Sequence, residues 1–367
     1  MKVAFRVDAS QNIGTGHIVR CLTLAEGLHE KYGTECVFIC RKHPGHLNNK
    51  IQKEGFNVIA LPENSKQYQP NPEDLAHASW LGCDWQTDAA QVRPVLEKIK
   101  PDCLIVDHYA LDFRWENELR LCYSTLMVID DLDDRKHICD LLLDQNLLVE
   151  KSKRYEGKLP EHCIKLIGPS NALLQPLYGK LHQKAKPRQL PVKRLLIFFG
   201  GADNDNLTGK TLTALQNLEC PDISVDVVMS KSSSFLKIIQ DQIKFQENVH
   251  LYCDLPSLAP LILKADLAIG AGGSTTWERL CLGLPSIVIS TSENQRPVAS
   301  DLHKLGLVQW IGHVDEVNIE KIEFELEQNF STQNLHKWSK RCLKECSGGG
   351  TAIVLEKLIS IYEKRNT

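Results

Sequence analysis

The sequence has no long apolar run, no excess of charge of one sign and no signal peptide at its start. Its 367 residues carry 43 Lys and Arg against 46 Asp and Glu, a formal net charge of −3. A general nucleic-acid binder usually presents a basic surface, and a membrane span needs about 20 consecutive apolar residues. We therefore expect no nucleic-acid partner and no membrane partner. A soluble, cytoplasmic protein fits these absences.

The 13 cysteines also lack the spacing of a disulfide framework or a zinc site. Their number is odd, no C-x-x-C motif occurs, and the closest pairs, Cys36/Cys40 and Cys342/Cys346, have no paired histidines nearby. Zinc sites usually need tighter motifs with a second ligand pair. We expect reduced cysteines that pack as small apolar side chains, and no metal site.

Short apolar runs alternate with segments of helical period along most of the chain. This pattern is typical of parallel sheets with crossover helices. The expected strands are 2–8, 35–40, 57–61, 102–107, 125–130 and 141–144 in the first half, and 194–199, 224–228, 249–252, 265–269, 285–289 and 307–310 in the second. The expected helices between them include 17–31, 88–98, 207–218, 275–282 and 296–304.

The chain is long enough for two domains. Segment 181–193 is rich in lysine, holds two prolines and has little periodicity, which predicts a linker. We expect an N-terminal Rossmann-like domain over 1–180 and a C-terminal one over 194–347. Three glycines then free a terminal helix, 348–367, to pack back on the first domain. In such an α/β protein, ligands bind outside the carboxyl ends of the strands, and the two domains can face each other across a cleft.

The loop between the first strand and the first helix contains two glycines, Gly14 and Gly16. Glycines let backbone N–H groups approach an anion, and the helix start adds its positive dipole end. A helix start also disfavours imidazolium, so His17 is expected to be neutral and able to accept a proton. The alternative is a histidine that only caps the helix or packs in the core. Val19 stands where the dinucleotide fingerprint G-x-G-x-x-G has its third glycine, which disfavours a dinucleotide-dependent oxidoreductase.

A glycine-rich turn follows another buried strand in the second half. Gly272, Gly273 and Ser274 precede a helix and form a cradle suited to a diphosphate. Glu278, one turn into that helix, can accept hydrogen bonds from a ribose, or it can simply complement the helix dipole.

Other polar loops follow neighbouring strands. Gly200-Gly201 indicates either room for phosphate or a tight turn, and the loop with Asn294 and Gln295 carries amides suited to sugar hydroxyls or to an ordinary turn. In the first half, Asp107-His108-Tyr109 ends a strand. The turn 130–134, with four carboxylates, is interpreted as helix caps or a solvated loop in preference to a metal site.

Several motifs run in order over nearly the whole chain: R-x-D from Arg6, G-x-G-H-x-x-R-C-L-T-L-A from Gly14, D-W-Q-T-D from Asp84, V-D-H-Y-x-L-D from Val106, L-D-Q-N from Leu143, F-G-G-x-D from Phe199, G-G-S-x-x-W-E from Gly272 and E-N-Q from Glu293. Together they resemble the UDP-2,4-diacetamido-2,4,6-trideoxy-β-L-altropyranose hydrolases of pseudaminic acid biosynthesis. One departure is a segment similar to the family's G-P-x-Y-A-L-L-R-P, in which Asn171 and Gln175 replace tyrosine and arginine.

The resemblance implies a glycosyltransferase-B fold, related to the peptidoglycan UDP-N-acetylglucosamine transferase. It implies hydrolysis of a UDP-linked diacetamido sugar by inverting attack of water at the anomeric carbon, without a cofactor. His17 matches the family's catalytic base, and Tyr109 and Asn294 match its catalytic tyrosine and amide. A monomer is expected. The predicted substrate-binding residues are Asp8, Gly14, Thr15, Gly16, Arg20, Asn146, Gly200, Gly201, Gly272, Gly273, Ser274, Glu278 and Gln295.

Three other functions fit the same architecture. An inverting UDP-sugar glycosyltransferase would use His17 to deprotonate an acceptor, and a UDP-sugar 2-epimerase would use the same nucleotide site. A non-catalytic nucleotide-sugar-binding protein explains the glycine-rich turns, but not the presence of His17, Tyr109 and Asn294 at strand edges.

Overall fold

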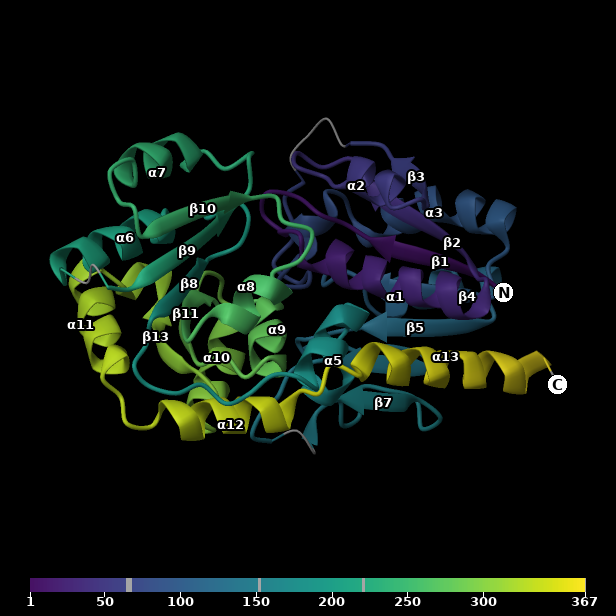
Figure 1. Ribbon diagram of the computed structural model, residues 1–367. Coiled ribbons are helices and arrows are strands. Elements are labelled where there is room, and N and C mark those ends of the chain that lie inside the picture. Colours follow the sequence, from purple (N-terminus) through teal and green to yellow (C-terminus); the bar gives the residue numbers. More distant parts are fainter. Residues whose placement is uncertain (64–67, 151–152, 220–221, 367) are drawn as a thin grey trace. The chain divides into compact units, whose positions relative to one another are not determined.

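The computed structural model describes residues 1–63, 68–150, 153–219 and 222–366. The chain divides into two compact units, each built on one parallel sheet (Figure 1). Unit 1 contains Met1–Asn146, Glu150–Leu173 and Gly350–Thr367, and unit 2 contains Leu147–Val149 and Leu174–Gly349.

The sheet of unit 1 has seven strands in the order β3-β2-β1-β4-β5-β6-β7. Their bounds are β1 Lys2–Val7, β2 Glu35–Arg41, β3 Asn57–Leu61, β4 Cys103–Asp107, β5 Thr125–Ile129, β6 Leu141–Asp144 and β7 Ile164–Ile167. The helices are α1 Gly16–Tyr32, α2 Asn48–Lys53, α3 Trp85–Ile99, α4 Phe113–Glu118 and α13 Gly350–Asn366, with short 3₁₀ turns η1 Ala78–Leu81, η2 Arg120–Cys122 and η4 Pro169–Asn171.

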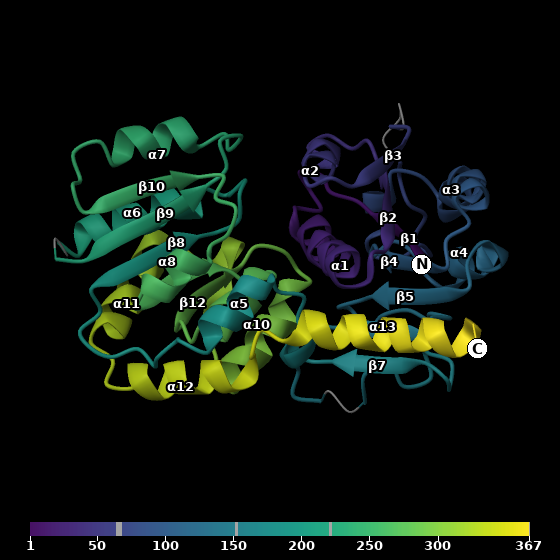
Figure 2. The same ribbon diagram turned by 45° about the vertical axis from the view of Figure 1, so that its right-hand side comes forward.

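Side-chain alternation divides the core of unit 1 between the two faces of this sheet. Val3 and Phe5 of β1 pack with α1 and α13 on one face, whereas Ala4 packs with α3 and α4 on the other. A parallel sheet covered on both faces needs strands that are apolar almost throughout, and β4 and β5 are buried at every position. Helix α1 ends at Gly33, whose φ of 61° favours glycine. Figure 2 shows α13 alongside β5 and β7.

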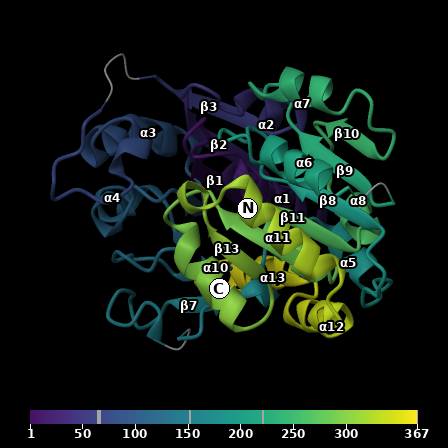
Figure 3. The ribbon, with the colours of Figure 1, turned by 90° about the vertical axis from the view of Figure 1, so that its left-hand side faces the viewer.

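Unit 2 repeats the plan with six parallel strands in the order β10-β9-β8-β11-β12-β13 (Figure 3). They are β8 Arg194–Phe198, β9 Ser224–Met229, β10 Val249–Cys253, β11 Leu267–Ala271, β12 Ser286–Ser290 and β13 Gln309–His313. Its helices are α5 Pro176–His182, α6 Leu207–Asn217, α7 Leu236–Gln242, α8 Ala259–Lys264, α9 Thr275–Cys281, α10 Gln295–Lys304, α11 Ile319–Phe330 and α12 Leu335–Glu345, with η5 Val314–Glu316.

The predicted fold class is confirmed: both halves are doubly wound α/β units, and the chain ends in helices. Every expected strand and helix is present, with ends displaced by no more than three residues. Strand β7 was not expected, because it has four residues and its Lys165 faces solvent.

The segment expected to be a linker, 181–193, is grouped with unit 2. Arg188 is buried there, and its guanidinium donates to the carbonyl oxygens of Ala265 and Ile262 at 2.8 Å each. Helix α5, placed by the sequence within 1–180, also belongs to unit 2, because it packs on α8 and α9. Helix α13, from the predicted 348–367 segment, belongs to unit 1 and packs on α1.

Each sheet changes direction at one point. In unit 1 the chain runs outward from β1 through β2 and β3, then returns to β4 on the other side of β1. In unit 2 the same reversal separates β8 from β11. The loops that leave the carboxyl ends of two such strands diverge, and α/β proteins bind ligands there. No helix in the described part of the chain is both long and apolar enough to span a membrane.

Candidate active site

The loop after β1 brings His17 to the reversal point of the first sheet. Gly14 adopts a φ of 78°, which favours glycine, and its N–H donates to the Ser10 carbonyl at 2.9 Å. Gly14 and Gly16 are half-buried and Thr15 is exposed, so this turn is open to solvent. Helix α1 begins at Gly16, which places His17 in its first turn.

Asp107, the last residue of β4, binds the imidazole of His17. Its Oδ1 lies 2.6 Å from His17 Nδ1. Burial by itself raises the pKa of Asp107, but the charges of Arg20 and His17 outweigh burial and hold that pKa below its usual range. An ionised carboxylate can only accept hydrogen bonds, so Nδ1 must carry a proton. A neutral His17 therefore has its lone pair on Nε2, the nitrogen that a general base uses.

Arg20, one helical turn after His17, connects this pair to a second carboxylate. Its Nε and Nη2 donate to Asp107 at 2.7 and 2.6 Å, and its Nη1 donates to Asp131 at 2.6 Å. Arg20 Nη2 also lies 3.3 Å from His17 Nδ1, but two N–H groups cannot bond to each other, so Asp107 is the shared acceptor. Arg20 is thus held by the protein's own carboxylates, although the sequence predicts that it contacts substrate.

Tyr109 joins the same cluster through Asp131. Its hydroxyl donates to Asp131 Oδ2 at 2.6 Å, and its ring packs edge-on against His17 with centroids 4.7 Å apart. Burial and the nearby Asp131 carboxylate raise the pKa of Tyr109 well above its ordinary value, so the hydroxyl stays protonated. His17 and Tyr109, both predicted catalytic residues, therefore lie together.

Two aromatic side chains from the segment around η1 complete the surroundings of His17. Trp80 stacks on Tyr109 with centroids 5.6 Å apart and lies edge-on to His17 at 6.4 Å. His77 contacts both Trp80 and Tyr109, at 4.6 and 5.4 Å. Burial lowers the pKa of His77, which favours a neutral ring. Sequence reasoning missed both residues, because nothing near them resembles a motif.

Asn146 also reaches this cluster, since its Nδ2 donates to the Asp131 carbonyl at 3.0 Å. The acidic turn 130–134 is not simply solvated, which corrects the expectation from its composition. Asp130 is fully buried and pairs with Arg135 at 2.8 Å, and Asp131 is the partner of Arg20 and Tyr109. Among the described residues, no three His, Cys, Asp or Glu side chains are arranged to hold a metal ion.

Asp8 has different partners from His17, despite its place at the end of β1. It is 1% exposed, and its Oδ1 lies 2.7 Å from Arg6 Nη1 and accepts from the Arg41 N–H at 2.6 Å. Arg6 in turn donates to Asp88 of α3 at 2.6 Å. Burial opposes the ionisation of Asp8, but Arg6 and the neighbouring His108 lower its pKa well below the usual value. The predicted substrate ligand is thus part of a buried ion network.

In unit 2, the predicted phosphate turn lies at the reversal point between β8 and β11. Gly272 and Gly273 are half-buried and Ser274 is exposed. Gln295 lies beside this turn, with its Oε1 3.3 Å from the position that a Cβ on Gly272 would take, and it accepts the Thr291 N–H at 3.0 Å. The structure therefore brings Gly272, Gly273 and Gln295 together.

The other predicted residues of unit 2 lie at the same sheet edge. Gly200 follows β8 with a φ of 94°, and a Cβ there would meet nothing within 4 Å, so the backbone is open. Gly201 packs near Ser230. Asn294 is the residue before α10. Its Oδ1 accepts a hydrogen bond from the Ser292 hydroxyl at 2.6 Å, and its amide N–H groups take no part in that bond.

Glu278 has a protein partner in unit 2. Its Oε2 accepts from the Tyr178 hydroxyl at 2.6 Å. Burial raises the pKa of Glu278, and the hydrogen bond from Tyr178 opposes that shift. One carboxylate oxygen is therefore used to hold α5 to α9, and Oε1 is the atom through which Glu278 can bind a ligand.

No protein-family model matches the chain. Among curated proteins, it is 28% identical over 306 residues to the UDP-2,4-diacetamido-2,4,6-trideoxy-β-L-altropyranose hydrolase of Campylobacter jejuni, covering 83% of this chain and 97% of that protein. It is 23% identical to the spore coat polysaccharide biosynthesis protein SpsG of Bacillus subtilis, covering 99% of each. It is also 24% identical to the uncharacterized protein MJ1062 of Methanocaldococcus jannaschii, where the match covers 83% of this chain but spans only 58% of that protein.

Solved structures show the fold. The chain superimposes on MurG of Acinetobacter baumannii with a TM-score of 0.66 at 12% identity, covering 98% of this chain and 99% of that one. A putative UDP-N-acetylglucosamine 2-epimerase of Listeria monocytogenes gives a TM-score of 0.61 at 12% identity, covering 99% and 97%. The predicted resemblance to the altropyranose hydrolase and the predicted glycosyltransferase-B-like fold are thereby confirmed.

Proposed function

We propose that the protein is a hydrolase that removes UDP from a UDP-linked 2,4-diacetamido-2,4,6-trideoxyhexose by inverting attack of water at the anomeric carbon. The observation that carries this proposal is the hydrogen bond between His17 Nδ1 and the ionised Asp107. It fixes the imidazole tautomer in which Nε2 can accept a proton. The named activity of the Campylobacter relative supplies the substrate class, and the proposed pathway is therefore that of pseudaminic acid.

In the proposed reaction, water bound at His17 attacks C1 of the sugar, and Nε2 takes one of its protons. The C1–O bond to the β-phosphate breaks, and UDP leaves with the bonding electron pair. The resulting imidazolium is stabilised by Asp107, as in other histidine–aspartate pairs. A positioned base of this kind contributes about 10²–10⁴-fold to the rate.

UDP needs no strong general acid, because a diphosphate is already a good leaving group. We propose that the turn of Gly272, Gly273 and Ser274 holds its phosphates and that Glu278 binds the ribose through Oε1. Gln295, the first residue of α10, lies beside this turn, and Asn294 directly precedes it; we propose that they bind the departing phosphate or the sugar. The free cysteines of the described chain fit a reducing compartment, the cytoplasm.

Two residues depart from the family pattern, which indicates either looser recognition of the sugar or a related sugar as substrate. Asn171 is one of them, and its Nδ2 donates to the Ile167 carbonyl at 3.2 Å within its own turn. Gln175 precedes α5 and makes no side-chain cap there. The proposal therefore specifies a diacetamido-trideoxyhexose and leaves its isomer to be measured.

The test is to incubate the purified protein with UDP-2,4-diacetamido-trideoxyhexose isomers in ¹⁸O-labelled water and to follow the products by NMR. The proposal expects free sugar that carries the label and has inverted anomeric configuration. Label in UDP would mean cleavage of the P–O bond, and UDP release that requires an added acceptor would mean a transferase. UDP binding without turnover of any isomer would mean a binding protein.

A further inference from the structure

Arg279 of α9 is a buried cation that the protein leaves largely unpaired. Its side chain is 3% exposed, and its Nη2 donates to the Ala271 carbonyl at 2.8 Å and to Thr276 Oγ1 at 3.1 Å. Among the described residues, its buried Nε has no hydrogen-bond partner. The carboxylate in that part of the chain that acts electrostatically on this guanidinium is Glu278, its neighbour in the sequence. A buried charge with few partners destabilises the folded protein, which indicates that Arg279 has a role other than stabilising the fold.

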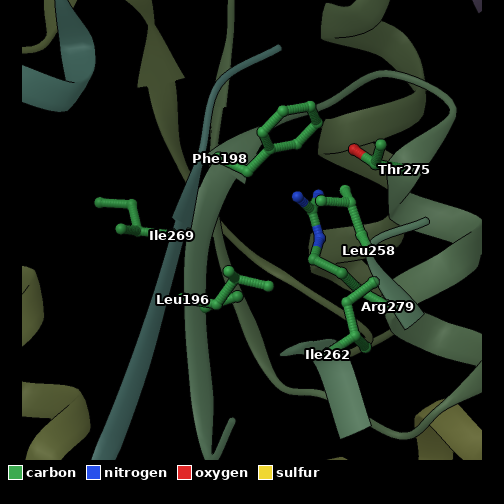
Figure 4. A pocket seen from close by; sticks show the side chains of 8 residues that line it. Leu196, Phe198, Leu258, Ile262, Ile269, Thr275 and Arg279 are labelled. Carbon is green, nitrogen blue, oxygen red and sulfur yellow. The ribbon is translucent and has the colours of Figure 1, made fainter. Parts of the chain in front are cut away.

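The guanidinium lies in a small apolar pocket at the reversal point between β8 and β11. Figure 4 shows it between Phe198, Leu258 and Thr275, above the aliphatic side chains that line the rest of the pocket. Burial lowers the pKa of Arg279 to about 10, against the opposing charge of Glu278, so the group remains charged at pH 7. In apolar surroundings its field is weakly screened.

The backbone around the guanidinium is fitted to it. A Cβ on Gly270 would come within 2.3 Å of the Phe198 carbonyl and 2.7 Å of Arg279 Nη1, so only glycine at this position of β11 leaves room for the paired strand β8 and for the guanidinium. The hydrogen bond to Ala271 then connects Arg279 to the residue directly before the Gly272–Ser274 turn.

Arg188 of the same unit is a buried arginine whose guanidinium nitrogens are all hydrogen-bonded. Its Nε, Nη1 and Nη2 donate to carbonyl oxygens, among them those of Ile262 and Leu263 at the end of α8. Those carbonyls are the negative end of a helix. Arg188 therefore needs no ligand, whereas Nε of Arg279 has no partner among the described residues, at the edge where a nucleotide is proposed to bind.

We propose that Arg279 is a buried cation that strengthens the binding of a nucleoside diphosphate at the Gly272–Gly273–Ser274 turn. This rests on the proposed function, which puts the diphosphate of the substrate at that turn. The positive charge of Arg279 acts on the phosphates through the apolar pocket. The hydrogen bond from Arg279 to the Ala271 carbonyl holds the start of the turn in place. A ligand with two phosphates gains more from this charge than a ligand with one, and an uncharged nucleoside gains nothing.

The experiment compares UDP, UMP and uridine by calorimetric titration of the full-length protein and its Arg279→Met variant. We expect UDP to bind about tenfold or more weakly to the variant, UMP to lose less, and uridine to bind unchanged. We expect the thermal stability of unliganded Arg279→Met to be equal or higher, because replacing a buried unpaired charge with an apolar side chain is often neutral or stabilising. Arg188→Met is the matched control, and its UDP affinity should equal that of the wild type.

Arg279→Gln provides the same test with a hydrogen-bond donor retained, should the methionine variant fold poorly. Unchanged UDP affinity in either folded variant, or an equal loss for UDP and uridine, overturns the proposal. If the wild-type protein binds no UDP, the nucleotide site itself is wrong, and that result is separate from the role of Arg279.

Discussion

Replacing Asp107 with asparagine tests the proposed chemistry most directly. The carboxylate accepts from His17 Nδ1 at 2.6 Å and from Arg20 at 2.6 and 2.7 Å. An amide has a single acceptor oxygen, whereas Asp107 Oδ1 serves both His17 Nδ1 and Arg20 Nη2, and Oδ2 serves Arg20 Nε. If the amide oxygen takes the Oδ2 position, its N–H₂ faces His17, so Nδ1 must accept a hydrogen bond and Nε2 carries the proton. If the amide oxygen takes the Oδ1 position, the tautomer is kept, but the imidazolium loses the negative charge that stabilises it. Either arrangement weakens Nε2 as a base.

The expected loss in kcat follows from that weakening of the base. It should approach the full contribution of a positioned base, about 10²–10⁴-fold, without removal of the imidazole. Loss of the charge also leaves Arg20 with Asp131 as its carboxylate partner, which should lower the free energy of unfolding by up to about 3–5 kcal/mol. The affinity for UDP should not change, because the proposed nucleotide site lies in unit 2.

The assay measures UDP release from the diacetamido-sugar substrate, with unfolding and UDP binding followed in parallel. The matched control is Asp226→Asn in unit 2, because Asp226 is also fully buried and accepts from Arg194 at 2.9 and 3.0 Å. It should lose stability and keep kcat. Near-normal turnover by a folded Asp107→Asn protein would refute the role of Asp107 in activating His17 and, with it, the role of His17 as base.

Three further predictions follow from individual contacts. Tyr109→Phe removes the hydroxyl that is hydrogen-bonded to Asp131 but keeps the ring against His17, so kcat should fall by about tenfold. This loss is well short of the loss expected for His17→Asn. An equal loss of kcat in the two variants would contradict the assignment of the base to His17 and of a supporting role to Tyr109. Gly270→Ala should lower the free energy of unfolding by about 1–3 kcal/mol, because its Cβ clashes with the backbone of β8. Gly273→Ala should keep its stability and bind UDP more weakly, because the nearest atom to its Cβ is 3.9 Å away. Chemical denaturation measures the first effect and titration with UDP measures the second. The pKa of Asp107 is lowered in the folded protein, so its stabilising contribution is complete above the unfolded carboxyl pKa of about 3.9 and is lost as the pH falls toward the folded pKa. The free energy of unfolding of Asp107→Asn should therefore fall less steeply with acid than that of the wild type. Parallel curves of unfolding free energy against pH would contradict the ion pair.

Much of the fold could be predicted because it depends on local patterns. Runs such as Cys103–Asp107 are buried at every position, and the α6 sequence buries residues at helical spacing, so both elements can be identified from the sequence. The positions of the glycine turns were likewise predictable, since they follow strands directly. Strand β7 was missed because a four-residue strand with a solvent-facing lysine carries little pattern.

The sequence by itself determined that a histidine stands at the start of a helix, after a glycine turn and beside a strand end. It could not determine what binds that histidine. Asp107 and Asp131 are 90 and 111 residues from the groups they contact, His17 and Arg20. They meet because the chain reverses direction in the sheet, which places β4 next to β1 and β5 next to β4. The same is true of Arg279, because two strands and a helix decide which of the described residues lie around its guanidinium. The charge of a side chain and the position of its proton depend on the residues that lie near it in space, and the tertiary structure alone decides which residues those are.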